Sequence, residues 1–393
     1  MPGRDLETLV TSWSYPTRIL FGPGTIGRVA EACREAGIAR PLVVTDPELA
    51  KLMPVARCLE ALASGGLAPA LFTGVRPNPT EENVREGVQV LRTGDHDGIV
   101  AIGGGSALDV GKLVAFMAAQ KRPIWDFEDI GDNWKRAETA GIRPVVAIPT
   151  TAGTGSEVGR AGVVTDPASH RKRVIFHPLM MPKTAILDPQ LTLGLPPRLT
   201  AWTGMDALSH CIEAYCAPAF HPLSDGVAVE GVRQIHKALV VAFEDGSDIA
   251  ARGRMLAASA MGAVAFQKGL GAVHALSHPI GAIYDTHHGL TNAVLLPYVL
   301  AHNYEAIETR ITRLAAFLGL PQPSFGAFLD WILELRQRLG IPHTLQELGI
   351  PRDRFDELAR MAVEDPTAAG NPTPLTVEVA RQLLEDAFTG EGV

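Results

Sequence analysis

Acidic and imidazole side chains in the second half of the chain have the types and spacing of a metal site. Asp206 and His210 are four residues apart in a segment whose apolar pattern predicts a helix, so both leave the same helical face. His274 and His278 repeat this spacing in a second predicted helix. With two further histidines that follow, the candidate ligands are Asp206, His210, His274, His278, His287 and His288.

The apolar surroundings of these residues favour one shared divalent cation. A buried imidazole needs a partner, and a buried carboxylate alone is costly. One carboxylate with three imidazoles suits Fe²⁺ or Zn²⁺, whereas carboxylate-only Mg²⁺ chemistry is disfavoured. Spacing alone leaves open which of the four histidines from residue 274 to residue 288 are ligands. Any single one of them could instead be a core or helix-end residue.

Two glycine-rich loops are candidates for binding a nucleotide. Residues 22–27 (GPGTIG) satisfy the GxGxxG pattern after a short strand-like segment. Residues 103–106 (GGGS) come directly after a buried strand and directly before a predicted helix. Three glycines let the backbone approach a pyrophosphate, and the helix N-terminus offers free N–H groups. We favour the second loop, because Pro23 removes an N–H from the first, which could be a tight turn into a helix.

Polar residues that follow two of the predicted strands could complete a nucleotide site. Asp46 at a strand end could accept hydrogen bonds from the adenosine ribose and repel a 2′-phosphate. It could equally cap the segment after Pro47. Thr150, Thr151 and Thr154 could contact phosphate or nicotinamide groups, or serve only as turn residues.

The pattern of apolar segments predicts two domains of different character. Strand-like runs at 41–45, 98–102 and 145–148 alternate with helix-like segments, which favours a parallel sheet covered on both faces. We therefore predict a Rossmann-like α/β domain over residues 1–190 and an all-α domain over residues 191–393. The helices of the second domain are expected near 199–216, 222–243, 248–267, 270–283, 289–304, 306–317, 324–339, 352–363 and 375–388.

Composition and charge exclude several classes of protein. The net charge is −8 and no block of lysine and arginine is present, which argues against binding to nucleic acid or to an anionic membrane. None of the four cysteines forms a CxxC pair, which argues against a cysteine zinc cluster or a thioredoxin-type redox pair, and a reducing cytoplasm is expected. Residues 1–10 carry charges and are predicted not to be a signal peptide. The apolar stretch 255–284 is interrupted by polar residues and is predicted to be buried helix rather than a membrane span.

Four segments of the chain share a pattern with a known family. They are the GGGS loop at 103–106, residues 148–158 (IPTTAGTGSEV), residues 195–215 (LPPRLTAWTGMDALSHCIEAY) and residues 273–303 (VHALSHPIGAIYDTHHGLTNAVLLPYVLAHN). Together they resemble the iron-dependent (group III) alcohol dehydrogenases, and within them the lactaldehyde reductase (propanediol oxidoreductase) branch. The histidine segment is the most specific of the four. Ala161 departs from the asparagine of lactaldehyde reductases.

This resemblance implies a role for individual residues. The metal ligands would be Asp206, His210, His274 and His288, and His287 would not be one. His278 matches a non-ligand histidine that is linked to proton transfer near the substrate. The implied nucleotide contacts are Asp46, Asn78, Gly103, Gly104, Gly105, Ser106, Asp109, Thr150, Thr151, Thr154 and Lys172.

The resemblance also implies an activity. It predicts a dehydroquinate synthase-like fold and a homodimer that transfers hydride between NAD(H) and a small primary alcohol or aldehyde. Fe²⁺, with Zn²⁺ as the alternative, would polarise the substrate oxygen. A glycerol dehydrogenase, a dehydroquinate synthase-like enzyme and a maleylacetate reductase are alternatives on the same scaffold, but the Asp206, His210, His274 and His288 set disfavours them. A metal hydrolase that binds no nucleotide is a further alternative, but it would not explain the GGGS loop.

Overall fold

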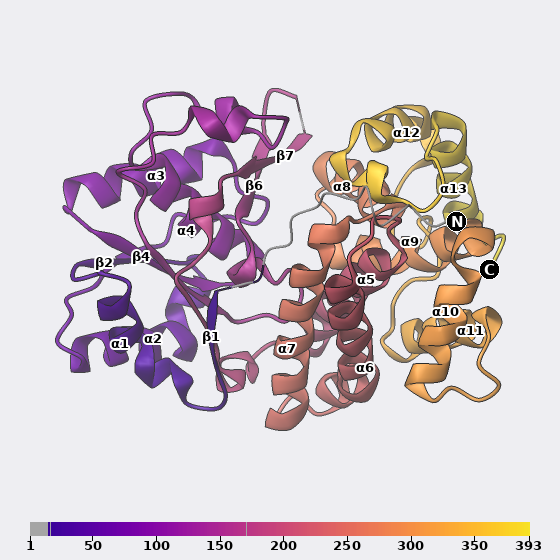
Figure 1. Cartoon of the computed structure of the whole chain (residues 1–393), viewed down its shortest axis with the longest axis horizontal. Coiled ribbons are helices and arrows are strands. Elements are labelled where there is room, and N and C mark those ends of the chain that lie inside the picture. The colour runs from indigo at the N-terminus through magenta and orange to yellow at the C-terminus, as the bar shows by residue number, and fades with distance from the viewer. Residues whose placement is uncertain (1–14, 16, 170) are drawn as a thin grey trace, which may run out of the picture.

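The computed structural model describes residues 15, 17–169 and 171–393. An α/β lobe and a helical lobe lie side by side (Figure 1), which confirms the predicted fold class. The predicted division at residue 190 falls in the short 3₁₀ helix η7 (Pro189–Thr192), between the last strand of the first lobe and the first long helix of the second. Residues 1–10, for which the absence of a signal peptide was predicted, lie outside the described residues.

A six-stranded parallel sheet forms the centre of the first lobe, in the order β1-β8-β5-β4-β2-β3. Its strands are β1 (Arg18–Phe21), β2 (Pro41–Val44), β3 (Ala70–Phe72), β4 (Gly98–Gly103), β5 (Val145–Pro149) and β8 (Thr184–Leu187). The central strands are buried on both faces, because two layers of helices cover them. Burial on both faces accounts for the continuous apolar sequences of the central strands.

The two layers of helices pack on opposite faces of this sheet. They are α1 (Val29–Glu35), α2 (Met53–Ser64), α3 (Glu81–Thr93) and α4 (Gly105–Met117). Val43 and Val100 point to the face covered by α1 and α2. Val44 and Ala101, one residue further along each strand, point to the face covered by α3 and α4. This alternation follows from the two-residue period of a strand.

The order of the strands reverses between β2 and β4. β3 lies outside β2 on one side, whereas β4, β5 and β8 follow one another on the other side. In open parallel sheets ligands bind at the carboxyl ends of the strands where the order reverses. Asp46 follows β2 and the GGGS loop follows β4, so both lie at that position.

The competing loop at residues 22–27 lies elsewhere. It follows the edge strand β1, and Gly22 and Gly24 have positive φ angles. The chain then enters a 3₁₀ helix at Thr25, and the Ile26 N–H donates to Asp188 Oδ2 at 3.0 Å. The loop is therefore a tight turn into a helix, and it lies away from the reversal of the sheet.

A two-stranded antiparallel hairpin of β6 (Ala161–Asp166) and β7 (Arg171–Phe176) follows the threonine-rich loop after β5. The sequence pattern did not predict this hairpin, because its strands are only partly buried and β7 begins with three charged residues. It matters for function, since α4 and the helix α8 of the second lobe both contact it.

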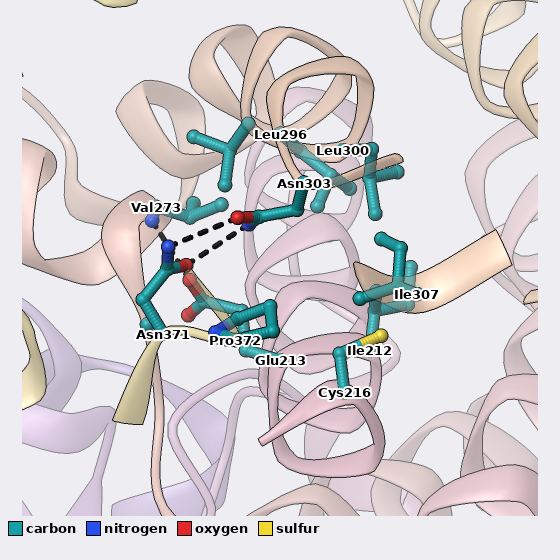
Figure 2. A pocket seen from close by; sticks show the side chains of 12 residues that line it. Ile212, Glu213, Cys216, Val273, Leu296, Leu300, Asn303, Ile307, Asn371 and Pro372 are labelled. Carbon is teal, nitrogen blue, oxygen red and sulfur yellow. Dashed lines mark hydrogen bonds between the residues drawn. The ribbon is translucent and has the colours of Figure 1, made fainter. Parts of the chain in front are cut away.

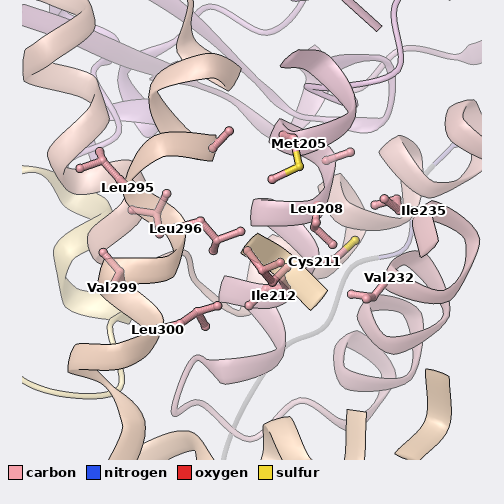
Figure 3. Packing of buried hydrophobic residues seen from close by; sticks show 14 of the residues in the cluster. Met205, Leu208, Cys211, Ile212, Val232, Ile235, Leu295, Leu296, Val299 and Leu300 are labelled. Carbon is pink, nitrogen blue, oxygen red and sulfur yellow. The ribbon is translucent and has the colours of Figure 1, made fainter. Parts of the chain in front are cut away.

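Nine helices, α5 to α13, build the second lobe, and residues 191–393 are described throughout. They are α5 (Pro197–Cys216), α6 (Pro222–Glu244), α7 (Ile249–Ala265), α8 (Ala272–Tyr284), α9 (His288–His302), α10 (Tyr304–Leu318), α11 (Phe325–Arg338), α12 (Phe355–Glu364) and α13 (Val377–Thr389). Each predicted helix is present. Figure 3 shows α5 packed between α6 and α9 through Leu208, Ile212, Val232, Ile235 and Leu296.

No single helix among the described residues is long and apolar enough to cross a membrane. The consecutive segments Ile249–Lys268 and Ala272–Tyr284 together meet the criteria of length and composition, but they are bent by 107°. Both belong to the packed core of the helical lobe, as the sequence predicted for residues 255–284.

The loop after β5 approaches the helical lobe so closely that Gly155 tolerates no side chain. Its φ is +62°, and a Cβ there would lie 2.6 Å from the Ser259 backbone oxygen and 2.3 Å from Ala263 Cβ. Gly24 also has a positive φ, +79°, but a Cβ there would meet nothing within 4 Å. We expect Gly24→Ala to cost only the strain of a left-handed backbone, roughly 1 kcal/mol.

We expect Gly155→Ala to cost about 1–3 kcal/mol more, because overpacking is added to the same strain. Urea unfolding of the two variants and the wild type measures the difference. Equal destabilisation by the two substitutions would contradict the close contact between the lobes.

Candidate metal centre and nucleotide cleft

Helix α5 supplies the first two candidate ligands. Pro197 begins the helix, and its interior is buried on all sides by α6, α7 and α9. Asp206 and His210 follow at i and i+4, are 3 % and 5 % exposed, and point to the same side. His210 Nε2 lies 3.8 Å from Asp206 Oδ1. The spacing of four residues therefore places both side chains on one face of α5, as predicted from the sequence.

The junction between α8 and α9 supplies the other two. His274 lies in the first turn of α8 and is 1 % exposed, and His288 is the first residue of α9. Asp285 adopts the left-handed conformation with φ +53°, so the chain turns within three residues. This turn brings the ring of His288 to 5.2 Å from that of His274.

The four side chains converge on one point. One ligand atom from each of Asp206, His210, His274 and His288 lies within 4.8 Å of every other. Asp206 Oδ1 is 3.9 Å from His274 Nε2 and 3.5 Å from His288 Nε2. Four ligands at about 2.1 Å from a tetrahedral ion are about 3.4 Å apart, so these separations fit a single cation. We call these four residues the metal quartet.

The protonation of the quartet also fits a metal. Burial lowers the pKa of His274 well below its ordinary value, and the neighbouring His210 lowers it further. Burial and His274 act in the same way on the pKa of His288. Both imidazoles are therefore neutral near pH 7, and the neutral imidazole is the form that binds a divalent cation. A carboxylate and three imidazoles match Fe²⁺ or Zn²⁺.

Asn292 is a neighbour of the quartet that the sequence reasoning missed. Its side chain is fully buried one turn after His288 on α9. Its Nδ2 donates to Asp206 Oδ1 at 2.8 Å and lies 3.1 Å from His288 Nε2. The spacing of four residues from His288 is a signal that could have revealed it.

His278 lies beside the quartet and not in it. Its ring stacks on that of His288 at 5.3 Å, and its side chain is 21 % exposed. Its Nδ1 lies 2.8 Å from Asp365 Oδ2. Burial opposes ionisation of Asp365, but His278 and Thr367 outweigh it and keep the pKa of this carboxyl below its ordinary value. Sequence reasoning could not pair Asp365 with His278, because the two are 87 residues apart.

His287 is also outside the quartet. Its ring lies 4.9 Å from that of Trp202, and burial lowers its pKa. Its backbone precedes the first turn of α9, where its carbonyl accepts the Thr291 N–H at 3.0 Å. Spacing alone could not choose between His287 and His288, whereas the resemblance left His287 out.

The two predicted loops of the nucleotide site meet at the carboxyl ends of β4 and β5. Gly104 is the N-cap of α4, and the Thr150 N–H donates to the Gly103 carbonyl at 3.0 Å. A Cβ at Gly105 would lie 2.6 Å from Thr154 Cγ2, and one at Gly104 would lie 3.6 Å from Thr151. A side chain at Gly105 would therefore clash with Thr154, whereas one at Gly104 would make an ordinary contact. The first turn of α4, with Ser106, has the helix N-terminus that suits an anion.

Asp46 lies next to this loop at the end of β2. Its Oδ1 accepts the N–H groups of Glu48 and Leu49 at 3.0 and 2.8 Å, so the capping interpretation is confirmed. Leu49 lies 3.3 Å from the position of a Cβ on Gly103. Binding of the adenosine ribose by Asp46 stays a prediction. It would use the other carboxylate oxygen, Oδ2.

The remaining predicted contacts connect the two lobes. Asp109 accepts from Ser156 Oγ at 2.5 Å and from the Val163 N–H at 3.1 Å, so it holds the threonine loop and β6 against α4. Asn78 donates to Asp285, at the turn between α8 and α9. Burial lowers the pKa of Lys172, and the carboxylates of Asp206, Asp285 and Asp109 oppose this shift. Lys172 Nζ lies beside α8, 3.5 Å from the position of a Cβ on Gly281.

Comparisons with known proteins agree with this geometry. Residues 16–189 match the iron-containing alcohol dehydrogenase family, and residues 200–388 match the C-terminal family of the Fe-containing alcohol dehydrogenases. The 4-hydroxybutyrate dehydrogenase of Cupriavidus necator is 38% identical over 384 residues, which cover 95% of this chain and 99% of that protein. This chain belongs to the iron-containing alcohol dehydrogenase family.

Solved structures of the iron-containing alcohol dehydrogenases extend the likeness to three dimensions. A 1,3-propanediol oxidoreductase superposes with a TM-score of 0.92 at 36% identity, covering 97% of this chain and 100% of that one. The sulfoacetaldehyde reductase of Bifidobacterium kashiwanohense, solved in complex with NAD+, gives a TM-score of 0.87 at 29% identity, covering 96% and 99%. The chain is thus a metal-dependent alcohol oxidoreductase, as its sequence predicted.

The quartet predicts which histidines a bound metal needs. We expect His274→Ala to weaken metal binding by roughly 100-fold or more, because loss of a ligand costs more than the 10–100-fold loss typical of outer residues. His287→Ala is the matched control, since it removes an adjacent, half-buried imidazole outside the quartet. Metal content after gel filtration, measured on both variants, tests the assignment. Full metal occupancy in His274→Ala, or loss of metal in His287→Ala, would contradict it.

Proposed function

We propose that the protein transfers hydride between NAD(H) and a small primary alcohol or the corresponding aldehyde. The observation that supports this most strongly is the metal quartet itself, in which one ligand atom each of Asp206, His210, His274 and His288 lies within 4.8 Å of every other. A metal quartet and a phosphate-binding loop that share one cleft suit an alcohol and a dinucleotide bound side by side. The names 4-hydroxybutyrate dehydrogenase and 1,3-propanediol oxidoreductase support primary alcohols of a few carbons.

We propose Fe²⁺ as the native metal and Zn²⁺ as the alternative. The donor set of one carboxylate and three imidazoles accepts either ion, and the family to which the chain belongs favours iron. A divalent cation held by the quartet supplies a Lewis acid that polarises the oxygen of the alcohol or aldehyde. The apolar burial of Asp206 and His274 excludes water from the inner side of this site.

Residues of the α/β lobe bind the nucleotide in this proposal. The GGGS loop and the N-terminus of α4 receive the pyrophosphate, because the start of a helix offers N–H groups to an anion and the helix dipole favours negative charge. Thr150, Thr151 and Thr154 line the neighbouring loop, and Asn78 and Lys172 contact the nucleotide where it approaches the quartet. Asp46 accepts the ribose hydroxyls through Oδ2. The NAD+ complex of sulfoacetaldehyde reductase supports NAD as the coenzyme.

His278 accepts the proton that leaves the alcohol, through the ribose hydroxyl. Asp365 accepts a hydrogen bond from Nδ1, so Nε2 is the ring nitrogen that can take up a proton. The partial exposure of His278 gives the proton a route to solvent. Asp365 therefore fixes the tautomer that a proton relay needs.

A homodimer and a cytoplasmic location, both expected from the sequence, are part of this proposal. Glycerol dehydrogenase, dehydroquinate synthase-like and maleylacetate reductase activities are the competing functions on this scaffold. The intact quartet disfavours them, because a carboxylate with three imidazoles fits the ligand pattern of the alcohol dehydrogenases.

The activity is tested with a panel of short alcohols and aldehydes. The protein is mixed with NAD or NADH, the absorbance of NADH is followed, and metal content is measured on the same sample. We expect turnover of primary alcohols or their aldehydes that is lost with a chelator and restored by Fe²⁺. Turnover of glycerol alone, reduction of maleylacetate alone, or undiminished activity without metal would overturn the proposal.

The coenzyme preference is tested at Asp46. Asp46→Asn keeps an acceptor for the Glu48 and Leu49 N–H groups but removes the charge that repels a 2′-phosphate. We expect kcat/KM with NADP to rise about tenfold relative to NAD, because one like-charge contact near the surface is worth roughly 1–4 kcal/mol. Asp46→Gly, which also loses the cap, should shift the preference further and lower the stability. An unchanged ratio of the two kcat/KM values in both variants would remove Asp46 from coenzyme selection.

A further inference from the structure

Glu213 is a buried carboxylate that lies directly behind the metal quartet. It follows His210 by three residues on α5, and its side chain points towards the start of α8, beside Asn371 (Figure 2). One carboxylate oxygen, Oε1, accepts the Val273 backbone N–H at 2.7 Å. The other oxygen, Oε2, contacts His274 Nδ1. Glu213 therefore holds both the backbone at the start of α8 and the ring of a metal ligand.

The contact with His274 is the one ion pair that the structure gives Glu213 among the described residues, and burial raises the pKa of this carboxyl to about 7. A small cavity lies behind the carboxylate, and its apolar walls include Ile212, Cys216, Leu296 and Leu300. The polar pair Asn303 and Asn371 borders the same cavity, but these amides bond to each other at 3.0 Å. Among the described residues, His274 is the ionisable group that pairs with Glu213.

Capping of α8 does not explain why a carboxylate is present. Asn371 caps the same helix with a neutral amide, since its Oδ1 accepts the Ala272 N–H at 3.1 Å. A neutral side-chain oxygen would therefore also be sufficient to accept the N–H of Val273, the residue after Ala272. A buried carboxylate costs more free energy than a buried amide unless its charge is used. The contact of Oε2 with the His274 ring is the use that the structure offers.

We infer that Glu213 is the positioning residue that makes His274 a metal ligand. Because the carboxylate accepts the proton on Nδ1, the lone pair stays on Nε2, the atom that lies 3.9 Å from Asp206 Oδ1. A carboxylate on the far nitrogen also makes the imidazole a better donor to a metal. The inference rests on the proposed metal site, and it explains how one of its four ligands keeps the correct tautomer.

The Glu213→Gln substitution removes the negative charge of this side chain and keeps its size and shape. Its amide offers one carbonyl oxygen for two donors, and its NH₂ group can donate to Nδ1, which moves the ring proton to Nε2. We expect the Kd for Co²⁺ to rise 10–100-fold, the usual cost of losing an outer partner of a metal ligand. The measurement is a titration of the chelator-stripped full chain with Co²⁺ alone at pH 8, followed by the visible absorption of the bound ion.

Asn371→Ala is the matched control, because it removes the other cap of α8 and leaves the His274 ring untouched. We expect it to lower the thermal unfolding temperature of the stripped protein while its Co²⁺ affinity stays close to that of the wild type. Wild-type affinity in Glu213→Gln would overturn the inference, and so would equal weakening in Asn371→Ala. Should Glu213→Gln not fold, Glu213→Asp replaces it in the same comparison, since its shorter carboxylate cannot reach both the Val273 N–H and the ring.

The wild-type titration distinguishes a failure of this inference from a failure of the proposed function. If the stripped wild-type chain takes up no Co²⁺, the metal quartet itself is wrong. If the wild type binds Co²⁺ tightly and Glu213→Gln binds it equally well, the quartet stands and only the role of Glu213 is lost.

Discussion

The burial of one carboxylate among three imidazoles is the constraint on which the rest of the structure depends. Asp206 lies in the most apolar part of the helical lobe, where an unpaired charge would be costly. Burial lowers the pKa of His274 and of His288 well below the ordinary value, so these two rings carry no positive charge near pH 7 that could compensate the carboxylate. A divalent cation held by the four side chains would supply that positive charge.

The same constraint explains the arrangement of the two lobes. The turn between α8 and α9 must present His288 to His274, and the α/β lobe contacts that turn through Asn78 and Lys172. Gly155 lets the threonine loop pack directly on α7. These contacts join the α/β lobe to the turn that carries His288, on the side of the sheet where the proposed nucleotide loop follows β4.

The sequence predicted the parts of this site that depend on local spacing. Asp206 and His210 were paired because helical periodicity is local, and the GGGS loop was identified because it joins a buried strand to a helix. The helices were predicted well for the same reason, as residues 222–243 show against Pro222–Glu244. Only the resemblance to a family separated His288 from His287, whose spacing from His274 differs by one residue.

Contacts between distant segments could not be predicted. Asp365 joins His278, and Asn78 joins Asp285, from elements that only the folded chain brings together. Glu213 was within reach of a spacing argument, since it lies three residues after His210, but its partner is 61 residues away. The β6–β7 hairpin lacked an apolar pattern because it is packed between the lobes and not in the centre of a core.

Anomalous X-ray diffraction from crystals of the Fe²⁺-loaded protein tests the central claim most directly. We predict one strong anomalous peak inside the helical lobe, at about 2.0–2.2 Å from Asp206 and from the three histidines of the quartet. A peak at another position, or no peak between these four side chains in a protein that has bound iron, would contradict the account.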